Sequence, residues 1–127
     1  MGASRDIALS ELPIRGVSIQ TAADGDGSIT VVPSDSGVIF VNKYITGNTT
    51  YTLPAVALCA GKWFWFYNAQ TTKTLIVDGD DTKMMGGGQT AYDSMTGTAD
   101  TGACGFILGD GTNYFFFEIA RSWTAGT

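Results

Sequence analysis

The 127-residue sequence predicts an all-β protein, either an antiparallel β-sandwich of jelly-roll type or a small β-barrel, with an extended N-terminal arm. Short apolar segments recur about every 8–12 residues, separated by Gly, Asp, Asn and Ser, and no segment has a convincing helical period. The chain has 17 glycines and only 3 prolines, and its 44% hydrophobic residues are ample for a packed core. We therefore expect one compact β domain.

We expect residues 1–34 to form the arm and the first strands, and residues 35–127 to form the sandwich. Apolar alternation or a short β-branched run, bounded by turn residues, marks each strand. The expected strands are 16–20, 28–32, 38–42, 49–53, 63–68, 73–78, 103–108 and 114–120. We expect 50–68 to fold as a core hairpin and 103–120 as a second hairpin, with 84–102 as a long glycine-rich loop.

Two aromatic runs stand out, because nine of the fifteen aromatic residues lie in 63–67 and 114–117. Side chains alternate between the two faces of a strand, so each run is apolar on both faces. If one face fills the core, the other needs a cover: a second sheet, the arm or another subunit. Homo-oligomerisation is the most economical cover, since one patch serves every copy. The interface candidates are Trp63, Trp65, Tyr67, Phe115, Phe116 and Phe117.

The charge distribution argues against nucleic acid or an anionic membrane as partner. The net charge is −5, and the seven basic residues are scattered rather than clustered. The sequence has neither a signal-peptide-like segment nor an apolar run long enough to span a bilayer. We expect Cys59 and Cys104 to be free, buried thiols, which suits synthesis in a reducing cytoplasm.

The residues that usually carry catalysis are scarce. Histidine is absent, the cysteines lack metal-ligand spacing, and no serine lies in a nucleophile elbow. Asp24 and Asp26 match early ligand positions of a calcium loop, but Ile29 stands where that loop needs glycine, so we expect a plain turn. The sequence therefore predicts no enzyme activity, no cofactor and no metal site.

One ordered set of motifs spans residues 34–127. It runs from the Ser36-Gly37 turn and strand 38–42 to Thr52-Leu53-Pro54, a short spacer and Gly61, and then to the aromatic strand ending at Asn68. Leu75-Ile76-Val77, a glycine-flanked hairpin and Ser122-Trp123-Thr124 follow. This arrangement resembles a β-rich module of tailed-bacteriophage virions, found in head decoration (cement) proteins and in parts of tail fibres.

The resemblance implies a structural protein that acts as a homotrimer on the outer surface of the virion capsid. Such proteins, made in the bacterial host cytoplasm, bind the major capsid protein of the assembled head and stabilise the shell. Residues outside the resemblance would form an arm that reaches along the shell or to a neighbouring subunit. Its candidate contacts are Ile7, Leu9 and Leu12.

Two other functions fit parts of the sequence. A tail- or head-fibre module could bind a host receptor or glycan, with Tyr92 and Asp93 presented by the loop 84–102. A small-ligand β-barrel similar to lipocalins could instead be lined by the aromatic residues. Sugar binding would favour the first, and a monomer with a ligand-sized cavity would favour the second.

Overall fold

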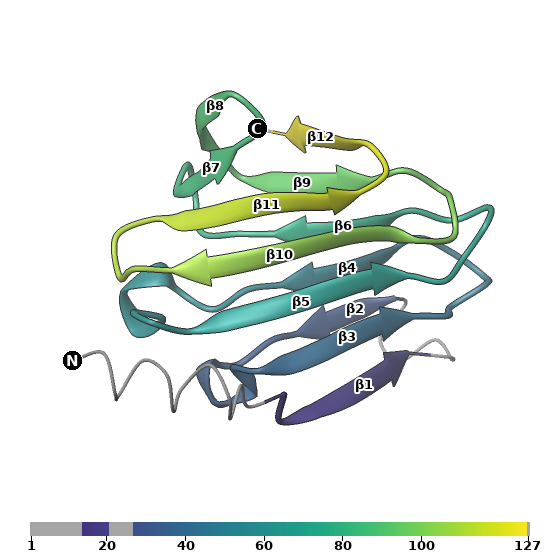
Figure 1. The fold of residues 1–127 in the computed structure, drawn as a ribbon, viewed down its shortest axis with the longest axis horizontal. Coiled ribbons are helices and arrows are strands. Elements are labelled where there is room, and N and C mark those ends of the chain that lie inside the picture. The colour runs from purple at the N-terminus through teal and green to yellow at the C-terminus, as the bar shows by residue number, and fades with distance from the viewer. Residues whose placement is uncertain (1–13, 21–26, 127) are drawn as a thin grey trace, which may run out of the picture.

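The computed structural model describes residues 14–20 and 27–126, and within them the chain is all-β, as predicted. The strands form two sheets that lie face to face (Figure 1). In that view the larger sheet faces the reader. The helical turns in the described ranges are single 3-10 turns, and none has the length or apolar character of a bilayer-spanning helix.

The large sheet has seven strands and the small sheet has five. In spatial order, the large sheet contains β1 (Gly16–Gln20), β3 (Val38–Asn42), β5 (Trp63–Asn68), β10 (Ala103–Gly109), β11 (Tyr114–Ala120), β7 (Met84–Gly86) and β8 (Gln89–Tyr92). The small sheet contains β12 (Trp123–Gly126), β9 (Ser94–Gly97), β6 (Leu75–Asp78), β4 (Thr49–Thr52) and β2 (Ser28–Thr30).

The first half of the chain is wound like a solenoid, which corrects the predicted antiparallel jelly roll. Strands β1 to β6 alternate between the two sheets, and successive coils pair in parallel. In the large sheet β1 pairs with β3 and β3 with β5, and in the small sheet β2 pairs with β4 and β4 with β6. The first coil, β1 and β2, thus continues the same two sheets as the coils after residue 34. A strand's own alternation is the same in parallel and antiparallel pairing, so the sequence pattern did not separate the two.

The segment 50–68 is a bridge between sheets rather than the predicted hairpin. Strand β4 lies in the small sheet and β5 in the large one, and η2 (Val56–Leu58) carries the chain across. The side chain of Val56 is buried, and its backbone N–H donates to Oδ2 of Asp80 at 3.1 Å. Pro54 and this turn therefore direct the chain across the end of the core.

Buried amides mark the corner at which each coil leaves the large sheet. Gln20, Asn42 and Asn68 are in register on β1, β3 and β5, and all three are buried. Asn42 donates from Nδ2 to Oδ1 of Asn68 at 3.1 Å, and its own Oδ1 accepts from Oγ1 of Thr49 at 2.7 Å and from the backbone of Tyr44 at 3.1 Å. The amides thereby satisfy backbone and hydroxyl groups that the turns would otherwise leave unpaired.

The second half of the chain is largely antiparallel. Strands β10 and β11 form the predicted hairpin, whereas the predicted loop 84–102 contains three strands, β7, β8 and β9. Its glycines have definite roles: Gly87 and Gly88, at φ 55° and 81°, turn β7 into β8. Strand β12 was also missed by the sequence reading. Trp123 places it, because its buried indole N–H donates to the carbonyls of Cys104 and Ala120 at 3.2 Å.

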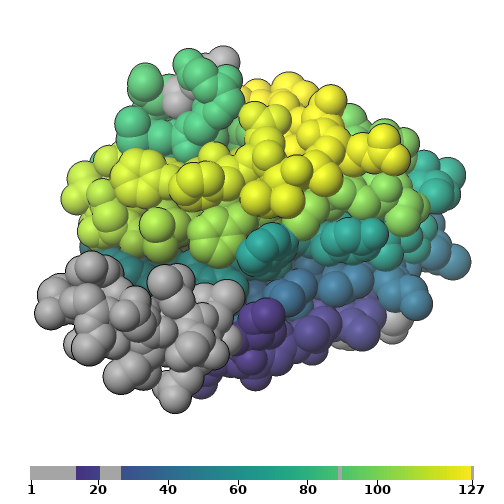
Figure 2. All heavy atoms as spheres, in the orientation of Figure 1, coloured from purple at the N-terminus to yellow at the C-terminus, as the bar shows by residue number. Residues whose placement is uncertain are grey.

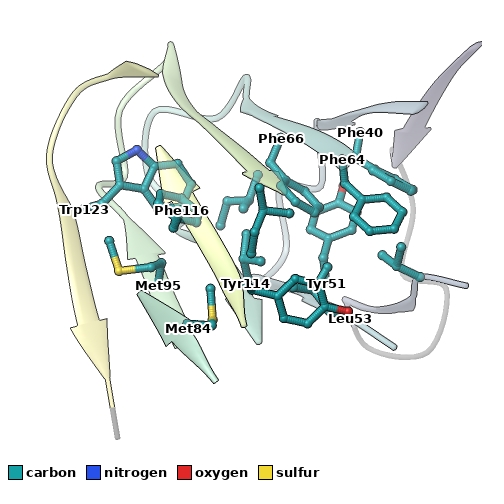
Figure 3. Close-up of a cluster of buried hydrophobic side chains, with 14 of the residues drawn as sticks. Phe40, Tyr51, Leu53, Phe64, Phe66, Met84, Met95, Tyr114, Phe116 and Trp123 are labelled. Atoms are coloured by element: carbon teal, nitrogen blue, oxygen red, sulfur yellow. The ribbon is translucent and has the colours of Figure 1, made fainter. Parts of the chain in front are cut away.

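The core lies between the sheets and is rich in aromatic rings (Figure 3). The rings of Phe40, Tyr51 and Phe66 lie with centroids 5.2–5.5 Å apart, and Phe116 packs on Trp123 at 4.8 Å. Such spacings are typical of stabilising aromatic pairs. Both cysteines are free and buried, as predicted.

Candidate functional site on the outer face of the large sheet

Strand β5 divides its aromatic residues between the two faces of the large sheet. Phe64 and Phe66 are fully buried in the core. Trp63, Trp65 and Tyr67 alternate with them and point to the outer face. Trp63 and Trp65 are half-buried, and Tyr67 is exposed. Three of the predicted interface residues therefore lie on one outer surface.

Strand β11 divides its run in the same way, which removes Phe116 from the interface candidates. Phe115 and Phe117 point outward, whereas Phe116 is 4% exposed and packs in the core against Trp123. Gly105 on the neighbouring strand leaves room for the Phe116 ring, because a Cβ there would collide with it. The sequence set included Phe116 because alternation alone does not tell which face is inside.

Strand β10 joins the two runs through Phe106. In register, Phe106 lies between Trp65 of β5 and Phe117 of β11. Its ring centroid is 5.3 Å from Trp65, 5.6 Å from Trp63 and 5.6 Å from Phe117. The five rings Trp63, Trp65, Phe106, Phe115 and Phe117 thus belong to adjacent strands of one surface.

Strands β3 and β1 extend this surface with aliphatic side chains. Ile39 pairs with Trp65 and Val41 with Tyr67, while Val17 and Ile19 follow on β1. We call the whole surface the aromatic face, and none of its side chains carries a charge at neutral pH. It consists of Val17, Ile19, Ile39, Val41, Trp63, Trp65, Tyr67, Cys104, Phe106, Leu108, Phe115 and Phe117.

Parts of the aromatic face are strongly exposed. Val17 is 58% exposed, Ile19 57% and Phe117 48%, whereas the rings of Trp63 and Trp65 pack against Phe106. Figure 2 shows the molecule from the side of the large sheet, where these strands run across it. A contiguous apolar surface of this kind is typical of a contact with another protein.

Two polar groups of the aromatic face, an indole and a thiol, are paired with each other. The indole N–H of Trp65 donates to Sγ of Cys104 at 2.7 Å. Burial raises the pKa of the Cys104 thiol, and this hydrogen bond offsets part of that shift. The thiol is therefore protonated at neutral pH, and a protonated thiol is a poor nucleophile. The surface offers apolar contact rather than covalent chemistry.

Sequence reasoning found the aromatic runs and the neighbouring strands, but it did not assign the apolar residues of those strands to the same surface. Ile39 and Val41 lie on a strand that was predicted, and so do Val17 and Ile19. The available signal was that these strands carry apolar residues at the positions that face outward. A strand that faces solvent on one side normally carries polar residues on that side. Phe106 gave a weaker signal, being a single ring between Gly105 and Ile107.

The alternative sites do not assemble in the described part of the chain. Tyr92 is fully buried, so it cannot present its ring to a sugar beside Asp93. The aromatic rings fill the core instead of lining a central ligand cavity, and both sheets have open edges. Within the described ranges, no three His, Cys, Asp or Glu side chains are grouped to hold a metal ion. Ile7, Leu9, Leu12, Asp24 and Asp26 lie outside the described residues.

Comparison with known proteins adds no relative. No protein-family model matches the chain, and no curated protein matches its sequence. The functional argument therefore rests on the aromatic face and on the motifs of the sequence.

Proposed function

We propose that this chain is a bacteriophage capsid decoration (cement) protein that binds the outside of the assembled head as a homotrimer and stabilises the shell. The observation that carries the proposal is the uncharged aromatic face on the outside of the large sheet. It supports a structural role through surface contact. The motif resemblance in residues 34–127 supports the assignment to a virion.

The aromatic face favours self-association for an energetic reason. Burying apolar surface is worth about 25 cal/mol per Å², so covering several exposed rings and aliphatic side chains yields several kcal/mol per copy. A second and a third copy offer an equivalent surface without any other partner. With Phe116 in the core, the proposed interface consists of Trp63, Trp65, Tyr67, Phe115 and Phe117, together with their neighbours on β10, β3 and β1.

A symmetric trimer would stabilise a capsid by mass action. A protein that binds only the assembled, expanded lattice shifts the equilibrium toward that lattice in proportion to its occupancy. Once one copy of a trimer has bound, the other two copies are held close to their own sites. The trimer therefore binds the lattice more tightly than a single weak contact would allow. The net charge of −5 fits a protein partner rather than nucleic acid. Neither catalysis nor a cofactor is needed for this role.

A fibre module that binds a glycan is the second candidate, and one observation favours it. Trp63, Trp65 and Tyr67 lie at alternate positions of β5, which places them about 7 Å apart in a row on an open sheet. Rings in such a row stack on successive apolar faces of sugars. In this case the aromatic face would remain uncovered by other copies.

Sedimentation equilibrium followed by a head-binding assay tests the proposal. We expect a native mass of three times the 13.4 kDa chain and saturable co-sedimentation with expanded, undecorated heads of the cognate phage. Bound protein should raise the temperature at which the heads release DNA. A monomer at about 100 µM, or a trimer that does not bind heads, would contradict it. Reproducible binding on a glycan array by a monomer would favour the fibre module.

A further inference from the structure

A second site lies at the end of the molecule formed by β7, β8 and β12, on the other side of β11 from the aromatic face. A cleft of about 260 Å³ opens there between the turn of β7 and β8 and the edge strand β12. Figures 1 and 2 show these segments together at one end. This volume is below the usual range for drug-sized ligands, so the cleft is the size of a single side chain or another small group.

The charge in the cleft comes from Glu118. Glu118 is on the inward side of β11 with Tyr114 and Phe116, but beyond them, where the core opens to solvent. Its Oε2 lies over Gly87, only 2.9 Å from the place where a Cβ would stand. No hydrogen bond or ion pair with another described residue engages this carboxylate. Among the described residues, it is also the only ionisable side chain that lines the cleft.

An unsatisfied hydroxyl lies behind the floor of the cleft. Tyr92 is fully buried, and its hydroxyl has no hydrogen-bond partner among the described residues. The oxygen lies behind Gly86, 3.0 Å from the position of a Cβ there. Burial and then the charge of Glu118 raise the pKa of Tyr92 to about 12, so the group is neutral.

The remaining walls suit the flat side of an organic cation. Trp123 lines the cleft while its indole N–H is already committed to two backbone carbonyls, so it offers ring surface rather than a donor. Met95 adds a polarisable sulfur nearby. A carboxylate beside an aromatic ring is the combination that binds ammonium and, better, guanidinium groups.

We propose that this cleft binds the guanidinium or ammonium group of a basic side chain, with Glu118 as its counter-ion, Trp123 as its wall and Tyr92 behind its floor. The inference does not depend on the assignment to a phage head. If both hold, the cleft receives an Arg or Lys side chain of the protein on which this chain docks. It would then add specificity to a surface whose main contact is apolar.

NMR titration tests the site with a charged and an uncharged probe. N-acetyl-L-arginine methylamide is expected to shift the backbone amides of Gly86, Gly87 and Thr124 saturably, with a dissociation constant on the order of 1 mM. N-acetyl-L-norleucine methylamide, which lacks the charge, should leave them nearly unchanged. An arginine-containing peptide should bind at least as well as the isolated residue if the source is a protein.

Two variants separate the site from general electrostatic attraction. Glu118→Gln should weaken arginine binding about tenfold, because the hydrogen bond to a charged group is lost. Asp100→Asn removes the same charge from an exposed turn and should leave binding unchanged. Both side chains are exposed, so the fold should survive, which the amide spectrum checks directly. Equal responses to the two probes, or equal effects of the two substitutions, would overturn the proposal.

Discussion

Phe117 carries the most exposed aromatic ring of the aromatic face, so Phe117→Ser is the sharpest test of that surface. A phenylalanine side chain buries roughly 200 Å² when fully covered. At 48% exposure, about 100 Å² of the ring remains available for a partner. At about 25 cal/mol per Å², its loss costs about 2.5 kcal/mol per copy, as an upper estimate. Three copies then lose about 7.5 kcal/mol, or between about five and six orders of magnitude in the monomer–trimer equilibrium constant.

Leu58→Ser is the matched control. Leu58 is 63% exposed but lies on η2, away from the aromatic face, so this substitution removes a similar apolar surface without touching the proposed interface. Sedimentation equilibrium at several concentrations should give a trimer for the native chain and for Leu58→Ser, and a monomer for Phe117→Ser at low micromolar concentration. Circular dichroism checks that both variants keep their strands.

Any of three results would refute this reasoning about the aromatic face. If Phe117→Ser and the native chain have the same mass at every concentration, the ring is not part of a subunit contact. If the native chain is itself monomeric, the aromatic face is not covered by copies of this protein. A loss of mass in Leu58→Ser equal to that in Phe117→Ser would place the contact elsewhere.

Three further predictions concern the fold. Asn42→Ala should lower the free energy of unfolding in urea by roughly 2–5 kcal/mol, because it leaves two buried donors without a hydrogen-bond partner. Asn48→Ala, which loses one exposed hydrogen bond, should cost under about 1 kcal/mol. Equal losses would mean that the buried hydrogen bonds of Asn42 do not form. Tyr51→Phe should be neutral or stabilise the fold by about 1 kcal/mol, since the hydroxyl has no hydrogen-bond partner among the described residues. Tyr114→Phe should cost about 1 kcal/mol, because it loses a 2.6 Å hydrogen bond to a backbone carbonyl. The opposite order would contradict the hydrogen-bond assignment. Burial raises the pKa of both tyrosines above the usual value, so the folded chain keeps protons that the unfolded chain releases, and the urea midpoint should fall as pH rises above about 10. A midpoint that is flat between pH 9 and 11 would disprove this linkage.

The pairing of strands between coils could not be predicted from the sequence. Turn residues located β3, β5 and the hairpin of β10 and β11, because turn chemistry is local. Whether β5 pairs with β4 or with β3 depends on contacts between segments more than twenty residues apart. Gln20, Asn42 and Asn68 are in register in the sheet, but the sequence does not show them as a repeat, since the coils between them differ in length.

The prediction of a loop at 84–102 was wrong for a different reason. Its glycines and polar residues are typical of a loop. The segment forms strands because Met84, Tyr92 and Met95 are buried in the core, β7 and β8 at one edge of the large sheet and β9 within the small sheet. Met95 and Gly97 are buried there, and a Cβ at Gly97 would lie only 3.1 Å from the Trp123 ring. Strand propensity is weak information where packing decides.

The sequence by itself determined that this protein is β-rich, that its cysteines are free thiols and that two strands have aromatic residues on both faces. The tertiary structure alone decided which face is which. Phe116 and Phe117 are neighbours of the same chemical type, yet one lies in the core and the other lies on the surface. Alternation fixes only that they point in opposite directions, and the position of the second sheet determines which direction is the interior.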